Sequence, residues 1–283
     1  MPERVAVVTD STAHLATEDA VERGIEVVPL QVVVDGSAMD EGTGIGPREV
    51  AEALRRHVPV TTSRPSPRSF LDVYESAAAQ GASSVVSVHL SGSLSGTADA
   101  ARLAARDAPV PVHVVDSRSL GMGLGFAVQT AASAAARGLT ADEVAELARD
   151  RAVRSSAFFY VDTLEYLRRG GRVGAATAVV GTALAIKPLL HLHDGWIELL
   201  EKVRTSGRAR ARLEDLAVAA AAAAPGPVDV AVHHLDNATR AGQLAQRLRE
   251  RLPSMSTLVV SEVGAVIGAH VGPGMLAVVI SPR

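Results

Sequence analysis

The 283-residue chain contains no cysteine, and this absence excludes several kinds of chemistry at once. Without a thiol there can be no disulfide, no cysteine nucleophile, no acyl thioester on this chain and no thiolate metal site. Lysine is almost absent too, since Lys187 and Lys202 are the only lysines among 28 basic residues. Compositional bias is the simplest reason, so we interpret an individual arginine as a surface residue unless further evidence gives it a role.

The sequence also lacks an excess of charge and a long apolar run. Its 28 basic and 31 acidic residues give a formal net charge of −3, which offers no electrostatic footprint for nucleic acid or for an anionic membrane. The longest apolar stretch, residues 174–186, is shorter than the ~18 residues of a membrane span. No signal peptide is visible before Asp10. We therefore expect a cytoplasmic protein without stable membrane insertion.

Aromatic residues are scarce, at 3% of a chain that is 47% hydrophobic. The core must therefore be filled by alanine, valine and leucine, and any pocket would have aliphatic walls. This composition argues against a nucleobase site, which often relies on ring stacking. It is compatible with an aliphatic ligand, although a plain aliphatic core explains it equally well.

At ~150 residues per domain, the length predicts one large domain or two of ordinary size. We expect an N-terminal α/β domain over residues 1–155, because alternating strand and helix patterns are typical of a mostly parallel sheet with helices on both faces. Ser66 and Pro67 mark one helix start as N-cap and first-turn residue. The expected strands are 5–9, 25–34 (one strand or a strand pair), 84–90 and 112–115, and the expected helices are 18–23, 48–57, 67–79, 97–106, 124–137 and 141–151.

Residues 156–283 are expected to form a C-terminal α+β domain with a mixed sheet, because hairpin signals here alternate with helices. Asp194-Gly195 predicts a hairpin turn, and Gly170-Gly171 ends a short helix. The segment 175–186 predicts an apolar helix that ends at Lys187. The other expected helices are 163–169, 208–224 and 238–252, and the expected strands are 158–161, 189–193, 197–200, 202–205, 228–235, 258–263 and 275–280.

Two hydroxyl-rich segments each lie directly before a predicted helix. In the first, residues 61–67, Thr62 or Ser63 could donate a hydrogen bond to an anion, although a capped helix start explains the segment more simply. The second, residues 91–97, follows a strand and combines glycines with Ser93 and Ser95 at a helix N-terminus, where a carboxylate or a phosphate is stabilised. No Glu or Gln stands three residues after a capping Ser or Thr there, which favours a ligand over a capping box.

Several common catalytic motifs are missing. There is no Gly-x-Ser-x-Gly nucleophile elbow, since Gly92 and Gly96 bracket Leu94, and neither lysine lies in a Walker loop. His191 and His193 share one face of a strand, but no third ligand lies at a metal-binding spacing. We therefore expect no metal ion and no catalytic residue on this chain.

Three further positions are harder to explain as solvated surface. Arg172 lies between a glycine turn and the expected apolar helix, and Arg204 is expected on a neighbouring strand. His270 lies in a glycine-rich loop before the final strand. A satisfied core histidine and a histidine that reaches a ligand are both compatible with that pattern.

Eight short motifs follow one another along nearly the whole chain. They are Val8-Thr9-Asp10-Ser11-Thr12, Thr62-Ser63-Arg64-Pro65-Ser66-Pro67, Leu94-Ser95-Gly96-Thr97, Val115-Asp116-Ser117, Leu167-Arg168-Arg169-Gly170-Gly171-Arg172, Ile186-Lys187-Pro188, Val203-Arg204-Thr205 and Gly268-Ala269-His270-Val271-Gly272-Pro273-Gly274. Together they resemble the DegV family, whose characterised members are the fatty-acid-binding subunits of bacterial fatty acid kinase (FakB-like proteins). The order and spacing of the motifs make the resemblance specific.

The resemblance implies a two-domain α/β protein that buries a long-chain fatty acid between or beneath its domains and needs no cofactor. Hydroxyl groups of the two segments above would hold the carboxylate, with a histidine near the head group. By position, the carboxylate-binding candidates are Thr62, Ser63, Ser93, Ser95, Gly96, Thr97 and His270.

The resemblance also implies a partner protein. Arg172 and Arg204 match basic positions associated with docking of an ATP-dependent kinase subunit or with phosphoryl transfer. The chain would present the carboxylate, and the partner would form an acyl phosphate for phospholipid synthesis, so the chain itself would be no enzyme. A lipid carrier without a kinase partner and a small-molecule enzyme on the same fold remain alternatives.

Two positions depart from the family pattern. Arg64 stands where many members have Gln, which adds a positive charge to the expected rim of the site. Ala98 stands where many members have Tyr, which widens or reshapes the expected pocket.

Overall fold

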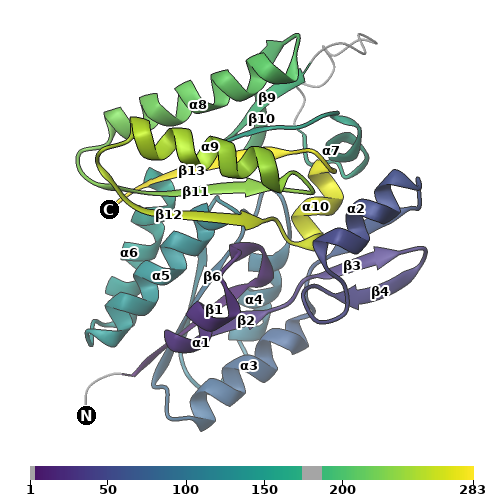
Figure 1. Ribbon diagram of the computed structural model, residues 1–283. Coiled ribbons are helices and arrows are strands. Elements are labelled where there is room, and N and C mark those ends of the chain that lie inside the picture. The colour runs from purple at the N-terminus through teal and green to yellow at the C-terminus, as the bar shows by residue number, and fades with distance from the viewer. Residues whose placement is uncertain (1–3, 174–186) are drawn as a thin grey trace. The chain divides into compact units, whose positions relative to one another are not determined.

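A computed structural model describes residues 4–173 and 187–283, so the helix expected over 175–186 lies outside the described residues. Contacts between Cα atoms divide the chain into two units. Figure 1 labels most of their helices and strands. Unit 1 contains Met1–Gln31 and Ser63–Arg154, and unit 2 contains Val32–Thr62 and Ser155–Arg283. The second boundary follows Arg154, next to the expected one. Residues 32–62, which the sequence pattern places with the N-terminal half, have their contacts with the C-terminal half.

Unit 1 is built on a parallel sheet, as the alternation of strands and helices predicts. Among the described residues its strand order is β2-β1-β6-β7, so the chain leaves β1 toward one side for β2 and returns to the other side for β6. The register places Val8 of β1 beside Ser87 of β6. The strands are β1 (Val5–Asp10), β2 (Ile25–Val28), β6 (Ser84–His89) and β7 (Val112–Asp116).

Helices cover both faces of this sheet. The strand residues alternate in direction, so Val8 and Val85 pack with Phe70 and Tyr74 in one apolar cluster. The helix that carries those two rings begins where its sequence predicts, because Ser66 Oγ accepts a hydrogen bond from the Ser69 amide at 3.1 Å. The elements are the 3-10 turn η1 (Ser11–Ala13) and the helices α1 (Thr17–Glu22), α3 (Pro67–Ala79), α4 (Thr97–Ala105), α5 (Met122–Ala136) and α6 (Ala141–Arg154).

Unit 2 contains a mixed sheet. Its strand order in the described residues is β10-β9-β8-β13-β11-β12, with only β11 and β12 parallel. Asp194 and Gly195 form the predicted hairpin turn, both with positive φ. The two strands expected over 197–200 and 202–205 are one strand, because a register shift between Leu199 and Glu201 interrupts the alternation without ending the strand. The strands are β8 (Ser156–Tyr160), β9 (Lys187–His193), β10 (Trp196–Val203), β11 (Val228–His234), β12 (Met255–Glu262) and β13 (Leu276–Pro282).

The core of unit 2 lies between this sheet and two helices. Leu213 and Ala217 of α8 (Ser206–Ala223) and Leu244 of α9 (Ala238–Arg251) pack on the buried side chains of β11 and β13. These positions recur every three or four residues, so each helix buries one stripe. Apart from Tyr160, the fully buried residues of this cluster are alanine, valine, leucine and isoleucine, as the shortage of aromatic residues requires.

A small sheet and three short helices complete unit 2. The sheet has the order β4-β3-β5, and α2 packs against α10 where Gly268 lies close to Val50 and Leu235. The expectation of a glycine-rich loop at His270 is wrong, since His270 lies in the last turn of α10. The elements are β3 (Gln31–Val34), β4 (Ser37–Asp40), β5 (Val60–Ser63), α2 (Pro47–Arg55), α7 (Glu165–Arg169) and α10 (Ala265–Val271). Within the described ranges, no helix is long and apolar enough to cross a membrane.

Candidate functional site

In unit 1 the serine- and glycine-rich loop, residues 90–96, lies at the carboxyl end of the parallel sheet. It connects β6 to α4, and β6 is the strand next to β1, where the strand order changes direction. Ligands of open α/β sheets bind outside the carboxyl ends of the strands at such a switch point. The topology therefore favours this loop as a ligand site independently of its sequence motif.

The loop presents two hydroxyl groups at the start of α4. Ser95 Oγ and Thr97 Oγ1 lie 2.9 Å apart and share a hydrogen bond. Gly96 is the N-cap and has no side chain that could accept from the first amides of the helix. Ser93 donates its amide to Ser91 Oγ at 3.2 Å, so it is held within the loop.

The side chains of two residues outside the loop lie close to its glycines. A Cβ atom built on Gly96 would overlap Nη1 of Arg64 and would lie 3.2 Å from its Cδ. The positive charge of Arg64 therefore lies beside the residue between Ser95 and Thr97. Asp116, from another of the sequence motifs, accepts a hydrogen bond from the Gly92 amide at 3.1 Å.

Unit 2 contains a cavity of about 370 Å³ that brings Thr62 and His270 together. Thr62 Oγ1 and His270 Nε2 form a hydrogen bond of 2.8 Å. Arg172 also lines the cavity, which joins three of the expected site residues in one unit. The lining residues are Leu54, His57, Pro59, Val60, Thr61, Thr62, Tyr166, Arg169, Gly170, Arg172, Ala269 and His270.

The imidazole of His270 is held in its neutral form. Burial, together with the smaller effect of the positive charge of Arg172, lowers the pKa of His270 from 6.5 to about 4. Arg172 is itself held in place, because its guanidinium donates to the carbonyl of Gly170. A neutral imidazole that donates from Nε2 to Thr62 Oγ1 leaves the Thr62 hydroxyl proton for a bound acceptor.

Close approach explains the glycines around this cavity. A Cβ on Gly170 would overlap Nδ1 of His270, and a Cβ on Gly272 would overlap the ring of Tyr166. Gly272 also has a φ of 74°, which few other residues adopt. The glycines therefore allow α7 and α10 to pack ring against backbone.

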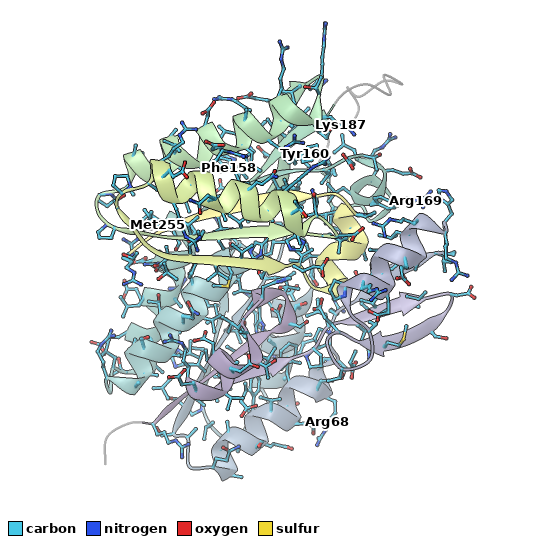
Figure 2. All side chains as sticks on the ribbon, in the orientation of Figure 1. Arg68, Phe158, Tyr160, Arg169, Lys187 and Met255 are labelled. Carbon is cyan, nitrogen blue, oxygen red and sulfur yellow. The ribbon has the colours of Figure 1, made fainter. Side chains whose placement is uncertain are left out.

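Lys187, one of the two lysines, belongs to a polar cluster at the start of β9. Its Nζ lies 3.1 Å from both Oδ1 and the carbonyl oxygen of Asp162. Tyr160 donates its hydroxyl proton to the same Oδ1, and Figure 2 labels Tyr160 and Lys187. Burial, together with the hydrogen bond to Asp162, raises the pKa of Tyr160 to about 12. The tyrosine therefore keeps its proton and acts as a donor.

Two expected site residues lie apart from these groups. Ser63 belongs to unit 1, directly after the boundary at Thr62, and its hydroxyl donates to Gln31 Oε1 at 3.3 Å. Arg204 is exposed and lies just after β10, not on a strand. It does not line the cavity of unit 2 that contains Arg172.

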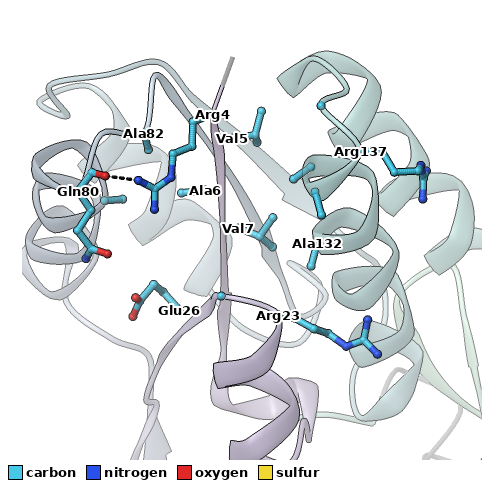
Figure 3. A pocket seen from close by; sticks show the side chains of 15 residues that line it. Arg4, Val5, Ala6, Val7, Arg23, Glu26, Gln80, Ala82, Ala132 and Arg137 are labelled. Atoms are coloured by element: carbon cyan, nitrogen blue, oxygen red, sulfur yellow. Dashed lines mark hydrogen bonds between the residues drawn. The ribbon is translucent and has the colours of Figure 1, made fainter. Parts of the chain in front are cut away.

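A second hollow, of about 550 Å³, lies at the amino end of the unit 1 sheet (Figure 3). Three arginines place positive charge at its rim. Arg4 donates to the carbonyl of Gln80 at the end of α3, Arg23 is the C-cap of α1 and Arg137 is the C-cap of α5. Cations at helix C-termini stabilise the helix dipoles, so these arginines have a structural explanation.

Unit 1 contains a buried row of hydrogen-bonded side chains that the sequence pattern did not predict. Asp10 Oδ2 lies 3.0 Å from His89 Nδ1, His89 Nε2 lies 2.7 Å from Ser87 Oγ, and Ser87 Oγ lies 2.8 Å from the hydroxyl of Tyr74. These are the contacts of a Ser-His-Asp triad. All four residues are fully buried and Tyr74 covers Ser87, so no substrate reaches this serine. In the parts of the chain that the structure describes, no group of three His, Asp or Glu could hold a metal ion.

Comparison with known proteins connects this geometry to a family. The model of the DegV family, described as an uncharacterised protein of that family, matches residues 4–283. A DegV domain-containing protein of Streptomyces coelicolor is 56% identical over the full length of both chains. One from Mycobacterium tuberculosis is 38% identical over 98% of this chain and 96% of its own.

Solved structures give the same result. The structure described as fatty acid binding of a DegV family protein from Thermus thermophilus is 35% identical and has a TM-score of 0.91, covering 99% of this chain and 100% of the other. DegV from Bacillus subtilis, described as a fatty acid binding protein, is 30% identical with a TM-score of 0.91 and the same coverage. The expected fold is thus confirmed across the chain.

Proposed function

Because this chain belongs to the DegV family, we propose that it binds a long-chain fatty acid and holds the carboxylate with hydroxyl donors. The fatty acid binding described for its Thermus and Bacillus relatives supports this proposal. The observation on this chain that carries it is the hydrogen bond between Thr62 and His270 in a cavity where the imidazole is neutral. A protein that binds an anionic head group without a metal needs such oriented donors.

Energetics favour a ligand with a long chain. Burial of each methylene contributes about 0.8 kcal/mol, so a chain of ~16 carbons contributes more than about 10 kcal/mol before ordering and association entropy are subtracted. The carboxylate opposes burial unless several donors replace its water. Neutral hydroxyls and backbone amides supply those donors, and the neutral imidazole orients the Thr62 hydroxyl.

Each unit carries its own candidate donors. In unit 1 they are Ser95, Thr97, the Gly96 amide and, as the alternative serine, Ser93. In unit 2 the donor is the Thr62 hydroxyl, which His270 orients. Ser63 is the weakest candidate, because its hydroxyl already donates to Gln31.

The proposal extends to a partner. Arg172 and Arg204 would dock an ATP-dependent fatty acid kinase in the cytoplasm or contact the phosphoryl group during transfer. Arg172 is placed for such a role because it lines the same cavity as His270. The chain then contributes the bound carboxylate, and the partner contributes the phosphoryl transfer that forms an acyl phosphate.

Native mass spectrometry tests the binding proposal. Delipidated protein is mixed with palmitate, and we expect one added mass of palmitate size. Ser95→Ala and Thr62→Val should weaken uptake, while Ser76→Ala on the exposed side of α3 should leave it unchanged. Comparison with Ser93→Ala identifies which serine of the loop contributes. Failure of the wild-type chain to take up any fatty acid would contradict the proposal.

A further inference from the structure

The buried chain of Tyr74, Ser87, His89 and Asp10 has no part in the function proposed so far. Each of these side chains is fully inaccessible to solvent. They come from three elements of unit 1: Tyr74 from α3, Ser87 and His89 from one face of β6, and Asp10 from the end of β1. Phe70 closes the same side, with its ring edge against His89 at a centroid distance of 5.0 Å.

Asp10 is the acceptor that ends this chain. Its Oδ2 accepts from His89 Nδ1 and from the Leu90 amide, each at 3.0 Å. Its Oδ1 accepts from the Thr12 amide at 3.1 Å and from the Thr12 hydroxyl at 2.6 Å. Four donors on two oxygens satisfy a fully buried carboxylate, which would otherwise be very costly.

With His89 neutral, one arrangement of protons satisfies every member. His89 donates from Nδ1 to Asp10, so its Nε2 must accept the hydroxyl proton of Ser87. Ser87 in turn accepts the proton of Tyr74, whose pKa burial raises to about 12. The chain therefore points in one direction, from α3 through β6 to the carboxylate on β1.

The carboxylate connects the two loops that follow β1 and β6. Through Thr12 it fixes the η1 turn after β1, and through Leu90 it fixes the first residue after β6. Ser91, the next residue, accepts the amides of Leu94 and Ser95 on its carbonyl oxygen, at 3.0 and 3.1 Å. Two hydrogen bonds, joined by the peptide bond between Leu90 and Ser91, thus connect Asp10 to the backbone of Ser95.

We infer that Asp10 is a positioning residue for the fatty-acid carboxylate, acting through Leu90 and Ser91 on the Ser95 and Thr97 hydroxyls. The inference rests on the proposed function. It gives a binding role to a carboxylate that cannot itself touch a ligand. It also explains why a complete triad geometry exists without an accessible nucleophile.

The test uses Asp10→Asn with Tyr74→Phe as the matched control. The Asn amide cannot accept on both sides of the group, so the Leu90 or the Thr12 contact is lost. Tyr74→Phe removes a hydroxyl that is buried to the same degree, at the far end of the chain. The readouts are palmitate affinity, the melting temperature and the carboxyl ¹³C resonance of bound [1-¹³C]palmitate.

We expect Asp10→Asn to weaken palmitate binding about tenfold, the cost of one misplaced hydrogen bond to a charged group, and to shift the carboxyl resonance. Tyr74→Phe should lower the melting temperature while affinity stays within about twofold and the resonance is unmoved. A structural role alone would change the melting temperature of both variants and the resonance of neither.

Two outcomes overturn the inference. One is an Asp10→Asn protein that binds palmitate with wild-type affinity and an unchanged carboxyl resonance. If Asp10→Asn does not fold, Asp10→Glu replaces it, because the longer side chain also displaces the acceptor of the Leu90 amide, and an unchanged resonance there has the same meaning. The other is a wild-type protein that binds no palmitate, which removes the proposed function as well. Wild-type binding with an unaffected variant removes the inference alone.

Discussion

Thr62 and His270 are 208 positions apart in the sequence, yet Thr62 Oγ1 and His270 Nε2 form a hydrogen bond of 2.8 Å inside unit 2. The bond joins the end of β5 to the last turn of α10. It gives the imidazole a polar partner in a place where burial and the charge of Arg172 both oppose protonation. The stability of this unit should therefore depend on the protonation of one histidine.

The free energy of unfolding should fall as the pH is lowered from 6.5 to 4. The folded pKa of His270 is about 4, below its ordinary value of 6.5. The unfolded chain therefore binds more protons in this window, which favours unfolding as the pH falls. The full contribution, about 3 kcal/mol, is present above pH 6.5 and lost at pH 4. Urea unfolding at successive pH values measures it.

His270→Gln should flatten that part of the pH profile, because the titrating group is gone. His57→Gln is the matched control, since His57 lines the same cavity but is exposed. The control should keep the wild-type slope between pH 6.5 and 4. Equal slopes for wild type and His270→Gln would show that His270 is not held neutral.

Gly170→Ala should displace the His270 ring. A Cβ at this position overlaps Nδ1 of the imidazole, and overpacking of this kind costs about 1–3 kcal/mol of stability. The Thr62 hydrogen bond is lost with the ring, so palmitate affinity should fall too. Gly242→Ala in α9 is the control, because nothing lies within 4 Å of its new methyl group. It should be neutral or stabilising by about 0.5–1 kcal/mol. Similar losses in both variants would contradict the prediction.

Arg64→Gln should weaken fatty-acid binding and reduce its dependence on salt. The Arg64 guanidinium packs on Gly96, between the two hydroxyl residues of the loop, and a cation near a carboxylate is screened by added salt. We expect a loss of about threefold to tenfold at low ionic strength. Arg68→Gln, which removes an exposed ion pair with Asp72, should leave affinity and salt slope unchanged. A wild-type salt slope in Arg64→Gln would exclude Arg64 from the head-group site.

Local signals in the sequence predict much of the fold. The helix at 67–79 has its expected bounds because Ser66 caps it and Pro67 starts it. The hairpin at Asp194-Gly195 is likewise a local event. Where local signals predict the wrong element, contacts with distant residues determine the structure. In α10, Gly268 indicates a loop, but packing on Val50 and Leu235 stabilises a helix.

The candidate site divides in the same way. The hydroxyl loop is readable because serines, glycines and a helix start are adjacent in the sequence. The family resemblance implies only that Thr62 and His270 each lie near the head group, and no local pattern predicts the hydrogen bond between them. Neither a local pattern nor a family motif predicts a role for His89, because it ends a strand of buried residues and its partner Asp10 is 79 positions away.

Arg204→Glu should abolish acyl-phosphate formation by a fatty acid kinase partner while palmitate binding persists. Arg204 is exposed, and no ion pair involves it within residues 4–173 and 187–283, so the substitution breaks no ion pair among these residues. Arg172→Glu should abolish the same reaction and should raise the pKa of His270 because it replaces the cation that lowers it, but its new negative charge in the cavity should also weaken fatty-acid binding. Trapping of the product with hydroxylamine measures the reaction, and native mass spectrometry measures the bound lipid.

The control is Arg249→Glu, another exposed arginine, at the end of α9. It changes the net charge by the same amount, so it should support the wild-type rate if docking depends on position and not on overall charge. A wild-type rate in both Arg204→Glu and Arg172→Glu would contradict the docking role and favour a lipid carrier without a kinase partner. Consumption of ATP by the purified chain alone would instead favour an enzyme, and it would require an active site other than the inaccessible Ser87.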